Sequence, residues 1–160
     1  TFVCAVGNDF EKGSPISYPA AYDAFCLAVG AVRYDLDRAP YSNVAAHIDV
    51  VAPGGDLRVD QNEDGYVDGI LQQTFVGEPN EFAYWFFQGT SMATPHVAGL
   101  AALLASQGIT DPNEIHEAIE ATAMDLGPPG WDPEYGWGMI DAAAAVAYHT
   151  PRRRQRRRGD

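Results

Sequence analysis

Basic residues are scarce in most of this sequence of 160 residues, which holds 10 lysines and arginines against 22 aspartates and glutamates. The basic residues before position 151 are Lys12, Arg33, Arg38 and Arg58. The first 150 residues therefore carry 4 positive and 21 negative charges, a balance of −17, and the last ten carry 6 and 1, a balance of +5. A body this acidic repels nucleic acid and anionic membranes over most of its surface and is compatible with sites for divalent cations.

Long apolar runs are also missing, because no stretch approaches the roughly 20 residues that a membrane span needs. Residues 1–9 lack the charged region and cleavage site of a signal peptide. The sequence starts without methionine inside an apparent strand, so we expect a processed or truncated piece of a longer protein. The two cysteines, Cys4 and Cys26, are too few for a disulfide framework. They could form one bridge in an oxidising compartment, but their apolar surroundings favour buried free thiols.

The hydrophobic pattern predicts one domain in which strands alternate with helices. Near-continuous apolar runs at 1–6, 25–32, 47–52 and 82–87 indicate strands, while 92–106, 111–123 and 140–148 indicate helices. Between them, residues 56–81 turn polar and acidic and are predicted to form a long surface loop. The order of elements predicts an α/β domain with a mainly parallel sheet.

A serine, Ser91, stands between the last predicted strand and an apolar helix. Unpaired amides at a helix N-terminus offer donors and positive partial charge to an oxyanion that forms beside them. The competing interpretation is that Ser91 only caps the helix, as serines often do.

The residues around Ser91 resemble a known family. The segment Gly89-Thr90-Ser91-Met92-Ala93-Thr94-Pro95-His96-Val97-Ala98-Gly99 is similar to the nucleophile signature of the subtilisin-like serine endopeptidases, the subtilases. Further segments follow in the order of that family: 5–8 (AVGN), 18–20 (YPA), 28–31 (AVGA), 41–43 (YSN), 49–54 (DVVAPG) and 135–138 (YGWG). The resemblance covers nearly all of residues 1–150. It implies the C-terminal portion of a three-layer α/β catalytic domain whose N-terminal part is missing.

The resemblance also implies roles for individual residues. Ser91 would be the nucleophile, and Asn8 would donate its side-chain amide to the oxyanion. Taken alone, Asn8 after Gly7 would be a turn residue. The pocket for the side chain before the scissile bond would be lined by Ala5, Val6, Gly7 and Ser17. Asp9 at its rim would favour basic or polar side chains.

Two members of the catalytic triad do not match any segment of this sequence. The family's aspartate and histidine motifs precede the serine in the chain, and His47, His96, His116 and His149 lie in other contexts. We therefore expect this chain alone to have little or no peptidase activity, and we expect its partners to be the missing N-terminal portion and a protein or peptide substrate. The alternative is a non-catalytic subtilase-like fragment that binds calcium or peptides. The family resemblance further implies a secreted, extracellular protein.

The acidic segment contains a spacing typical of calcium loops. Oxygen-bearing side chains stand at loop positions 1, 3, 5 and 9, with Gly65 at position 6. The candidate Ca²⁺ ligands are Asp60, Asn62, Asp64, the main chain of Tyr66, and Asp68. Leu71 occupies position 12, where an EF-hand has glutamate, so this is not a complete EF-hand. A solvated acidic loop is the alternative. The family resemblance adds Asp49, with carbonyls near Ala24 and Cys26, as a second calcium candidate.

The last ten residues differ from everything before them. Six arginines in seven positions, 152–158, repel one another and predict a disordered tail over 151–160. Such a tail could bind nucleic acid, an anionic surface or the acidic body, or it could be a solvated end without a partner.

Overall fold

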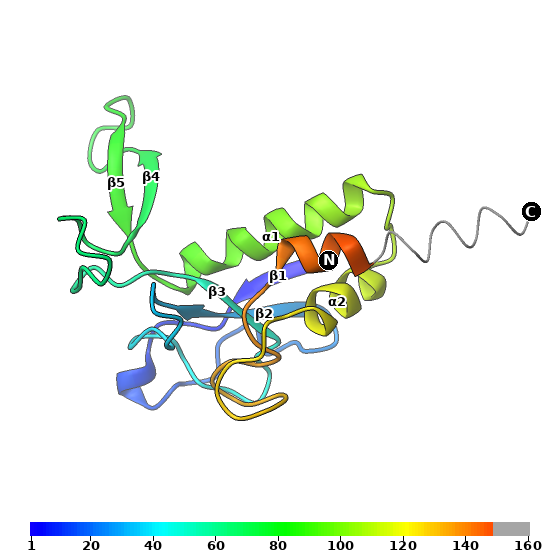
Figure 1. The fold of residues 1–160 in the computed structure, drawn as a ribbon. Helices are drawn as coiled ribbons and strands as arrows, with labels where there is room; N and C mark the ends of the chain where they lie inside the picture. Colours follow the sequence, from blue (N-terminus) through cyan, green and yellow to red (C-terminus); the bar gives the residue numbers. More distant parts are fainter. Residues whose placement is uncertain (149–160) are drawn as a thin grey trace, which may run out of the picture.

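A parallel three-stranded sheet lies at the centre of the computed structural model, which describes residues 1–148 (Figure 1). Its strands are β1 (Phe2–Ala5), β2 (Cys26–Val32) and β3 (Val50–Pro53), in the spatial order β1-β2-β3. Every residue of β2 is buried, which explains its unbroken apolar sequence: both faces of this central strand are covered. The predicted mainly parallel α/β arrangement is confirmed.

Two helices, α1 (Thr90–Ser106) and α2 (Pro112–Ala121), pack on one side of the sheet. The core between α1 and the strands holds Leu27, Val29 and Val50 from the sheet and Val97 and Leu104 from the helix. The start of α2 follows the sequence signal, because the Asp111 side chain accepts the N–H of Asn113 (2.9 Å) with Pro112 in the first helical position. Residues 142–148 are helical as well.

The other face of the sheet is covered by loop residues, including Ala20 and Ile48, which pack on Cys4, Val6 and Cys26. Cys4 and Cys26 are buried and free. Burial, together with the neighbouring Cys26, raises the pKa of the Cys4 thiol to about 12. Two buried, free thiols in an apolar cluster agree with the interpretation of these cysteines as core residues.

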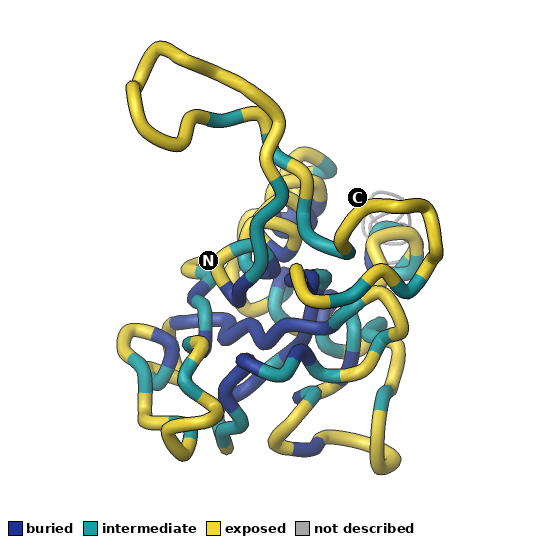
Figure 2. The backbone as a smooth tube through the Cα atoms, turned by 90° about the vertical axis from the view of Figure 1, so that its left-hand side faces the viewer, coloured by how far each residue is buried: buried dark blue, intermediate teal, exposed yellow. Residues whose placement is uncertain are grey.

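The segment predicted as a long loop, 56–81, contains a strand. Residues β4 (Ile70–Thr74) pair antiparallel with β5 (Ala83–Phe87), and this hairpin projects from the body beyond the first turn of α1 (Figure 1). The loop prediction was wrong at 70–74 because the two glutamines and the acidic neighbourhood conceal a strand whose hydrogen-bonding partner is the aromatic run of β5. Figure 2 shows the exposed tip of the hairpin above the buried sheet. Among residues 1–148, no helix combines the length and apolarity required to cross a membrane.

The helix α1 begins two residues earlier than its sequence pattern predicts. It starts at Thr90, so Pro95 lies inside the helix and not in its first turn. Because proline has no N–H, the carbonyl of Ser91, four residues earlier, lacks its usual helical donor. The first turn of α1 therefore depends on partners outside the helix.

Candidate active site

Ser91 lies in the first turn of α1 and is exposed to solvent. The N-cap of the helix is Gly89, which has no side chain to cap it. The interpretation of Ser91 as a simple helix cap is therefore wrong. Instead, its side chain stands at the end of the helix where the backbone amides are free to bind a negative charge.

Asn8 follows β1 and lies directly against this helix end. Its side-chain oxygen accepts two hydrogen bonds from Thr90, one from the main-chain N–H and one from the hydroxyl, both at 2.9 Å. With the oxygen engaged in this way, the amide nitrogen of Asn8 remains as a donor on the side next to Ser91. Thr90 is fully buried and was missed by sequence reasoning, because a threonine beside the nucleophile has no signal of its own.

The two candidate oxyanion donors lie close to one position beside Gly89. A Cβ atom built on Gly89 would lie 3.5 Å from Asn8 Nδ2, 3.7 Å from the main-chain N of Ser91 and 3.8 Å from Asn8 Oδ1. Gly89 also has φ +145°, a backbone conformation that residues other than glycine rarely adopt. Glycine at this position therefore keeps open the space that both donors border.

The residues predicted to line the pocket for the side chain before the scissile bond lie near Asn8. A Cβ on Gly7 would lie 3.6 Å from the Cβ of Ser17, so these two segments face each other closely. Val6 is buried at 1% exposure and can offer only its main chain, whereas Ala5 is half-buried. Asp9 pairs with Lys12 (2.6 Å), an exposed ion pair that reduces its charge at the rim. The preference of Asp9 for basic substrates therefore stays a prediction.

The histidines occupy other places. His96 lies on α1, and its Nδ1 contacts the carbonyl of Met92 (2.9 Å), one turn back along the helix. His116 lies on α2, where burial lowers its pKa. His47 precedes β3, and His149 is outside the described residues. The described chain thus brings Ser91 close to two candidate oxyanion donors, whereas His96 bonds to its own helix and the Nε2 atoms of His47 and His116 are buried without a hydrogen-bond partner.

The loop that carries the calcium spacing folds back on itself. Asp60 accepts the N–H groups of Asp64 (3.2 Å) and Gly65 (2.9 Å), and Asp64 accepts the N–H of Tyr66 (2.9 Å). Asn62 contacts Asp64 through a side-chain hydrogen bond of 3.0 Å. These oxygens are of the hard type that Ca²⁺ prefers. Within residues 1–148, however, no three histidine, cysteine, aspartate or glutamate side chains form a group that could hold a metal ion.

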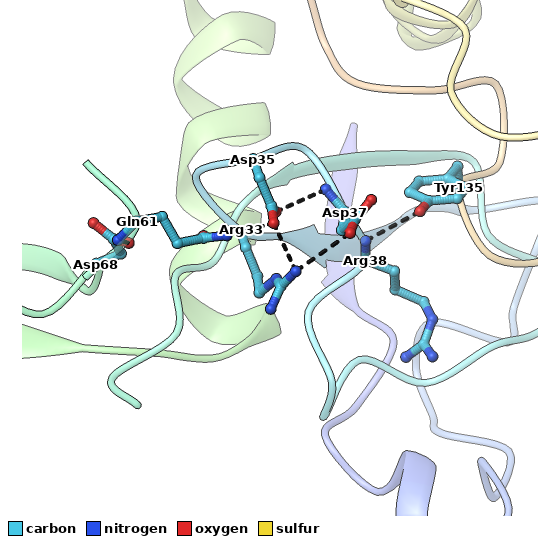
Figure 3. Close-up of polar contacts among 7 residues, drawn as sticks. All are labelled: Arg33, Asp35, Asp37, Arg38, Gln61, Asp68 and Tyr135. Atoms are coloured by element: carbon cyan, nitrogen blue, oxygen red, sulfur yellow. Dashed lines mark hydrogen bonds and ion pairs between the residues drawn. The ribbon is translucent and has the colours of Figure 1, made fainter. Parts of the chain in front are cut away.

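Figure 3 shows how this loop is joined to the segment after β2. Arg33 contacts both Asp35 (2.7 Å) and Asp37 (3.3 Å), and the side-chain amide of Gln61 donates to Asp35. The main-chain N–H of Gln61 donates to Asp68 Oδ2 (2.5 Å). One carboxylate oxygen of the predicted ligand Asp68 is therefore engaged by the protein itself, and the loop is joined to the exposed Asp35 after β2.

The second calcium candidate, Asp49, stands just before β3. Its carboxylate accepts the N–H of Ala28 (2.6 Å), and burial raises its pKa to about 7, with further contributions from Glu120 and Asp23. A carboxylate so desolvated and surrounded by like charge favours a proton or a bound cation. A calcium ion at Asp49 stays a prediction.

Comparison with known proteins agrees with this geometry. The sequence model described as "Subtilase family" (Peptidase_S8) matches residues 1–138. Subtilisin NAT of Bacillus subtilis subsp. natto is 38% identical over 145 residues, which cover 89% of this chain and 32% of that protein. The thermophilic serine proteinase of Bacillus sp. (strain AK1) is 43% identical over 148 residues, covering 91% of this chain and 30% of that protein. The chain thus spans about a third of the length of these relatives.

Solved structures show the same fold. A lanthipeptide protease superposes with a TM-score of 0.73 at 28% identity, covering 92% of this chain and 50% of the other. A protease from Pseudoalteromonas arctica superposes with the same TM-score at 35% identity, covering 90% and 41% respectively. The expected subtilisin-like α/β fold is confirmed.

Proposed function

Because this chain belongs to the subtilase family, we propose that it supplies the nucleophile and the oxyanion-binding half of a serine endopeptidase that cleaves peptide bonds in proteins. The observation that carries this proposal is the proximity of Asn8 Nδ2 and the Ser91 main-chain N to one position beside Gly89. Two amide donors that border one position next to a serine hydroxyl suit the negative oxygen that forms when a carbonyl is attacked.

In the proposed reaction, Ser91 Oγ attacks the carbonyl carbon of the scissile bond and loses its proton to a histidine base. The carbonyl oxygen becomes negative and accepts hydrogen bonds from Asn8 and from the main chain of Ser91. The C–N bond then breaks, the proton passes to the amine that leaves, and water hydrolyses the ester left on Ser91. Asn8 needs no charge to act, so it does not compete with the base for the proton.

We propose that the histidine and the aspartate come from a chain segment outside these 160 residues. Without a base, a serine hydroxyl is a weak nucleophile at neutral pH. A fluorophosphonate probe tests this: we expect it to label Ser91 when the chain is joined to the N-terminal portion that carries both residues, and not to label the 160-residue chain alone. Ser91→Ala removes the target, while Ser106→Ala, an exposed serine on the same helix, is the matched control.

Two results would contradict the proposal. Ser91-dependent hydrolysis by the purified 160-residue chain would show that the base is present within it. If the joined protein folds but neither reacts with the probe nor cleaves peptides, the chain has instead a non-catalytic, peptide-binding or calcium-binding role.

Calcium binding is part of the same proposal. Asp60, Asn62 and Asp64 supply the ligand types and the spacing, and Asp49 is a desolvated carboxylate next to β2. A bound Ca²⁺ would neutralise these carboxylates and hold the acidic loop in one conformation. Calorimetric titration with CaCl₂ after EGTA treatment tests both sites, with the Asp64→Asn and Asp49→Asn variants to separate them.

Export from the cell and the behaviour of the arginine tail stay predictions. Residues 151–160 lie outside the described part of the chain. If the tail binds polyanions, binding to heparin should weaken steeply with salt and vanish when 151–160 are deleted.

A further inference from the structure

Asn43 is a buried amide, 2% exposed, whose polar side-chain atoms all bind main-chain groups. Its Oδ1 accepts the N–H of Asp9 (2.7 Å), and its Nδ2 donates to the carbonyls of Val6 (3.0 Å) and Pro15 (3.2 Å). A buried amide with three such bonds is costly to replace, since any substitution leaves main-chain groups without partners. The side chain of Asn43 therefore fixes the backbone around it.

The backbone that Asn43 fixes is the segment that presents Asn8. The main-chain N–H of Asn43 donates to the carbonyl of Gly7 (3.0 Å), and its side chain accepts from Asp9. The residues immediately before and after Asn8 are thus both bound to Asn43. The approach is close enough that a Cβ on Gly7 would lie 2.6 Å from Asn43 Nδ2. Glycine at position 7 is therefore required for this contact.

Residues 41–43 also contact the N-terminal end of α1, which carries Ser91. The Tyr41 hydroxyl accepts the N–H of Gly89 (3.0 Å) and donates to the carbonyl of Gly55 (2.8 Å), while the Tyr41 carbonyl accepts the N–H of Phe10 (3.3 Å). Between the two, Ser42 is fully buried, and its hydroxyl accepts the N–H of Ala31 in β2 (3.0 Å). Residues 41–43 thus connect the oxyanion side, the nucleophile side and the sheet.

We propose that Asn43, assisted by Tyr41, is a positioning residue that sets the Asn8 amide in place relative to Ser91. The inference rests on the proposed function and adds to it a residue that touches neither substrate nor reacting atoms. Asn43 acts through the main chain of residues 7 and 9, and Tyr41 acts through Gly89. The donors of Asn8 and Ser91 then converge before substrate arrives, so no binding energy is used to organise them.

The test is a double-mutant cycle in the joined, active protein. Asn43→Asp keeps the size and the acceptor but loses at least one of the two N–H bonds to Val6 and Pro15. We expect kcat to fall about tenfold to a hundredfold with little change in KM, because a misplaced oxyanion donor affects the transition state and not substrate binding. In the Asn8→Ala background the same substitution should lower kcat less than about threefold, since the group it positions is gone.

Equal losses in both backgrounds, or no loss in either, would overturn the proposal. If Asn8→Ala itself leaves kcat unchanged, the proposed role of Asn8 fails instead, so the two failures are distinguishable. Should Asn43→Asp not fold, Asn43→Ser provides the same cycle, because its smaller side chain also lacks the amide donors to Val6 and Pro15. Ser14→Ala is the matched control: it removes a neighbouring bond, from the N–H of Val44 to Ser14 Oγ (3.0 Å), without touching Asn8.

Amide hydrogen exchange on the 160-residue chain gives a readout independent of activity. The Thr90 N–H lies in the first helical turn and is protected by Asn8 Oδ1. We expect Asn43→Asp to accelerate its exchange, although the two residues are not bonded to each other. The Ser14→Ala control should accelerate exchange at Val44 alone. Unchanged protection of Thr90 in the Asn43→Asp chain would overturn the proposed positioning.

Discussion

The Asn8–Ser91 site and the acidic loop at 60–68 are both built from polar side chains, but they are organised in opposite ways. At the first, hydrogen bonds join residues 82, 48 and 34 positions apart. In the second, most bonds span two to seven positions within the loop, and one longer bond, from the Gln61 side chain to Asp35, spans 26. Long-range bonds form only when the whole domain has folded, whereas bonds within a loop can open locally. The first site is therefore organised by the fold, and the second is organised mainly by its own local bonds.

The largest loss of activity is expected when the space beside Gly89 is filled. In the joined protein, Gly89→Ala puts a methyl group between Asn8 Nδ2 and the Ser91 N–H and should lower kcat/KM by about 10² to 10³. That magnitude is the one associated with the oxyanion asparagine of subtilisin, not one calculated from this structure. Steady-state hydrolysis of a chromogenic peptide measures it.

The control for that variant is Gly77→Ala. Gly77 also has positive φ (+119°), but a Cβ there would meet nothing within 4 Å. It should therefore cost stability through backbone strain, on the order of 1 kcal/mol, and leave kcat/KM unchanged. Equal losses of activity in both variants would mean that strain, not the blocked oxyanion space, is responsible.

Removal of calcium should affect the loop and leave the geometry around Asn8 intact. At a calcium concentration a hundred times the dissociation constant, binding stabilises the folded chain by about 2.7 kcal/mol, so EGTA should lower the thermal midpoint by several degrees. Asp64→Asn should remove the part of this difference that is due to the loop. Glu63→Gln removes the same charge at a position outside the ligand spacing and should retain it. A calcium response equal in all three chains would exclude this loop as the site.

The pH dependence of stability tests Asp49. Its folded-state pKa of about 7 lies above the unfolded value of 3.8, so its contribution is fully present below about pH 4 and is lost as the pH rises through 7. Because solvent reaches part of this carboxylate, we expect the free energy of unfolding to fall by an amount on the order of 2 kcal/mol. The measurement is made in EGTA so that no calcium ion binds Asp49. Urea unfolding between pH 5 and 8 measures it. Asp49→Asn should flatten the profile, and a profile as steep as that of the unchanged chain would contradict the assignment.

The smallest effect concerns Thr90. Thr90→Val removes the hydroxyl bond to Asn8 and leaves the main-chain bond, which should cost about 1 kcal/mol of transition-state stabilisation, or about five- to tenfold in kcat. Thr90→Ser retains the hydroxyl and should restore most of the activity. A Thr90→Ser variant as slow as Thr90→Val would show that packing of the methyl group, not the hydrogen bond, matters.

The sequence predicted the elements whose pattern is local. The apolar run of β2 and the Asp111-Pro112 start of α2 are readable without a structure, because burial and capping leave a signal within a few residues. The subtilase-like segment around Ser91 is readable in the same way. The roles of Thr90, Tyr41 and Asn43 were not readable. Their partners lie 82, 48 and 34 positions away, and hydrogen bonds of that span leave no periodicity. Strand β4 was not predicted for a related reason, because it is a strand through its hydrogen bonds to β5.

The hydrogen bonds between residues 41–54 and Gly89 have a consequence for recombining this domain with its relatives. The Gly89 N–H binds both the Tyr41 hydroxyl and the Gly54 carbonyl (3.0 Å each), and Asn8 binds Thr90. A chimera that takes residues 1–54 from one parent and Gly89 and Thr90 from another would separate hydrogen-bond partners that were matched in the parent chain. Crossover points placed between β3 and β4 would divide the sequence without cutting a strand, yet such hybrids should work only when both parents supply compatible residues at 8, 41 and 90.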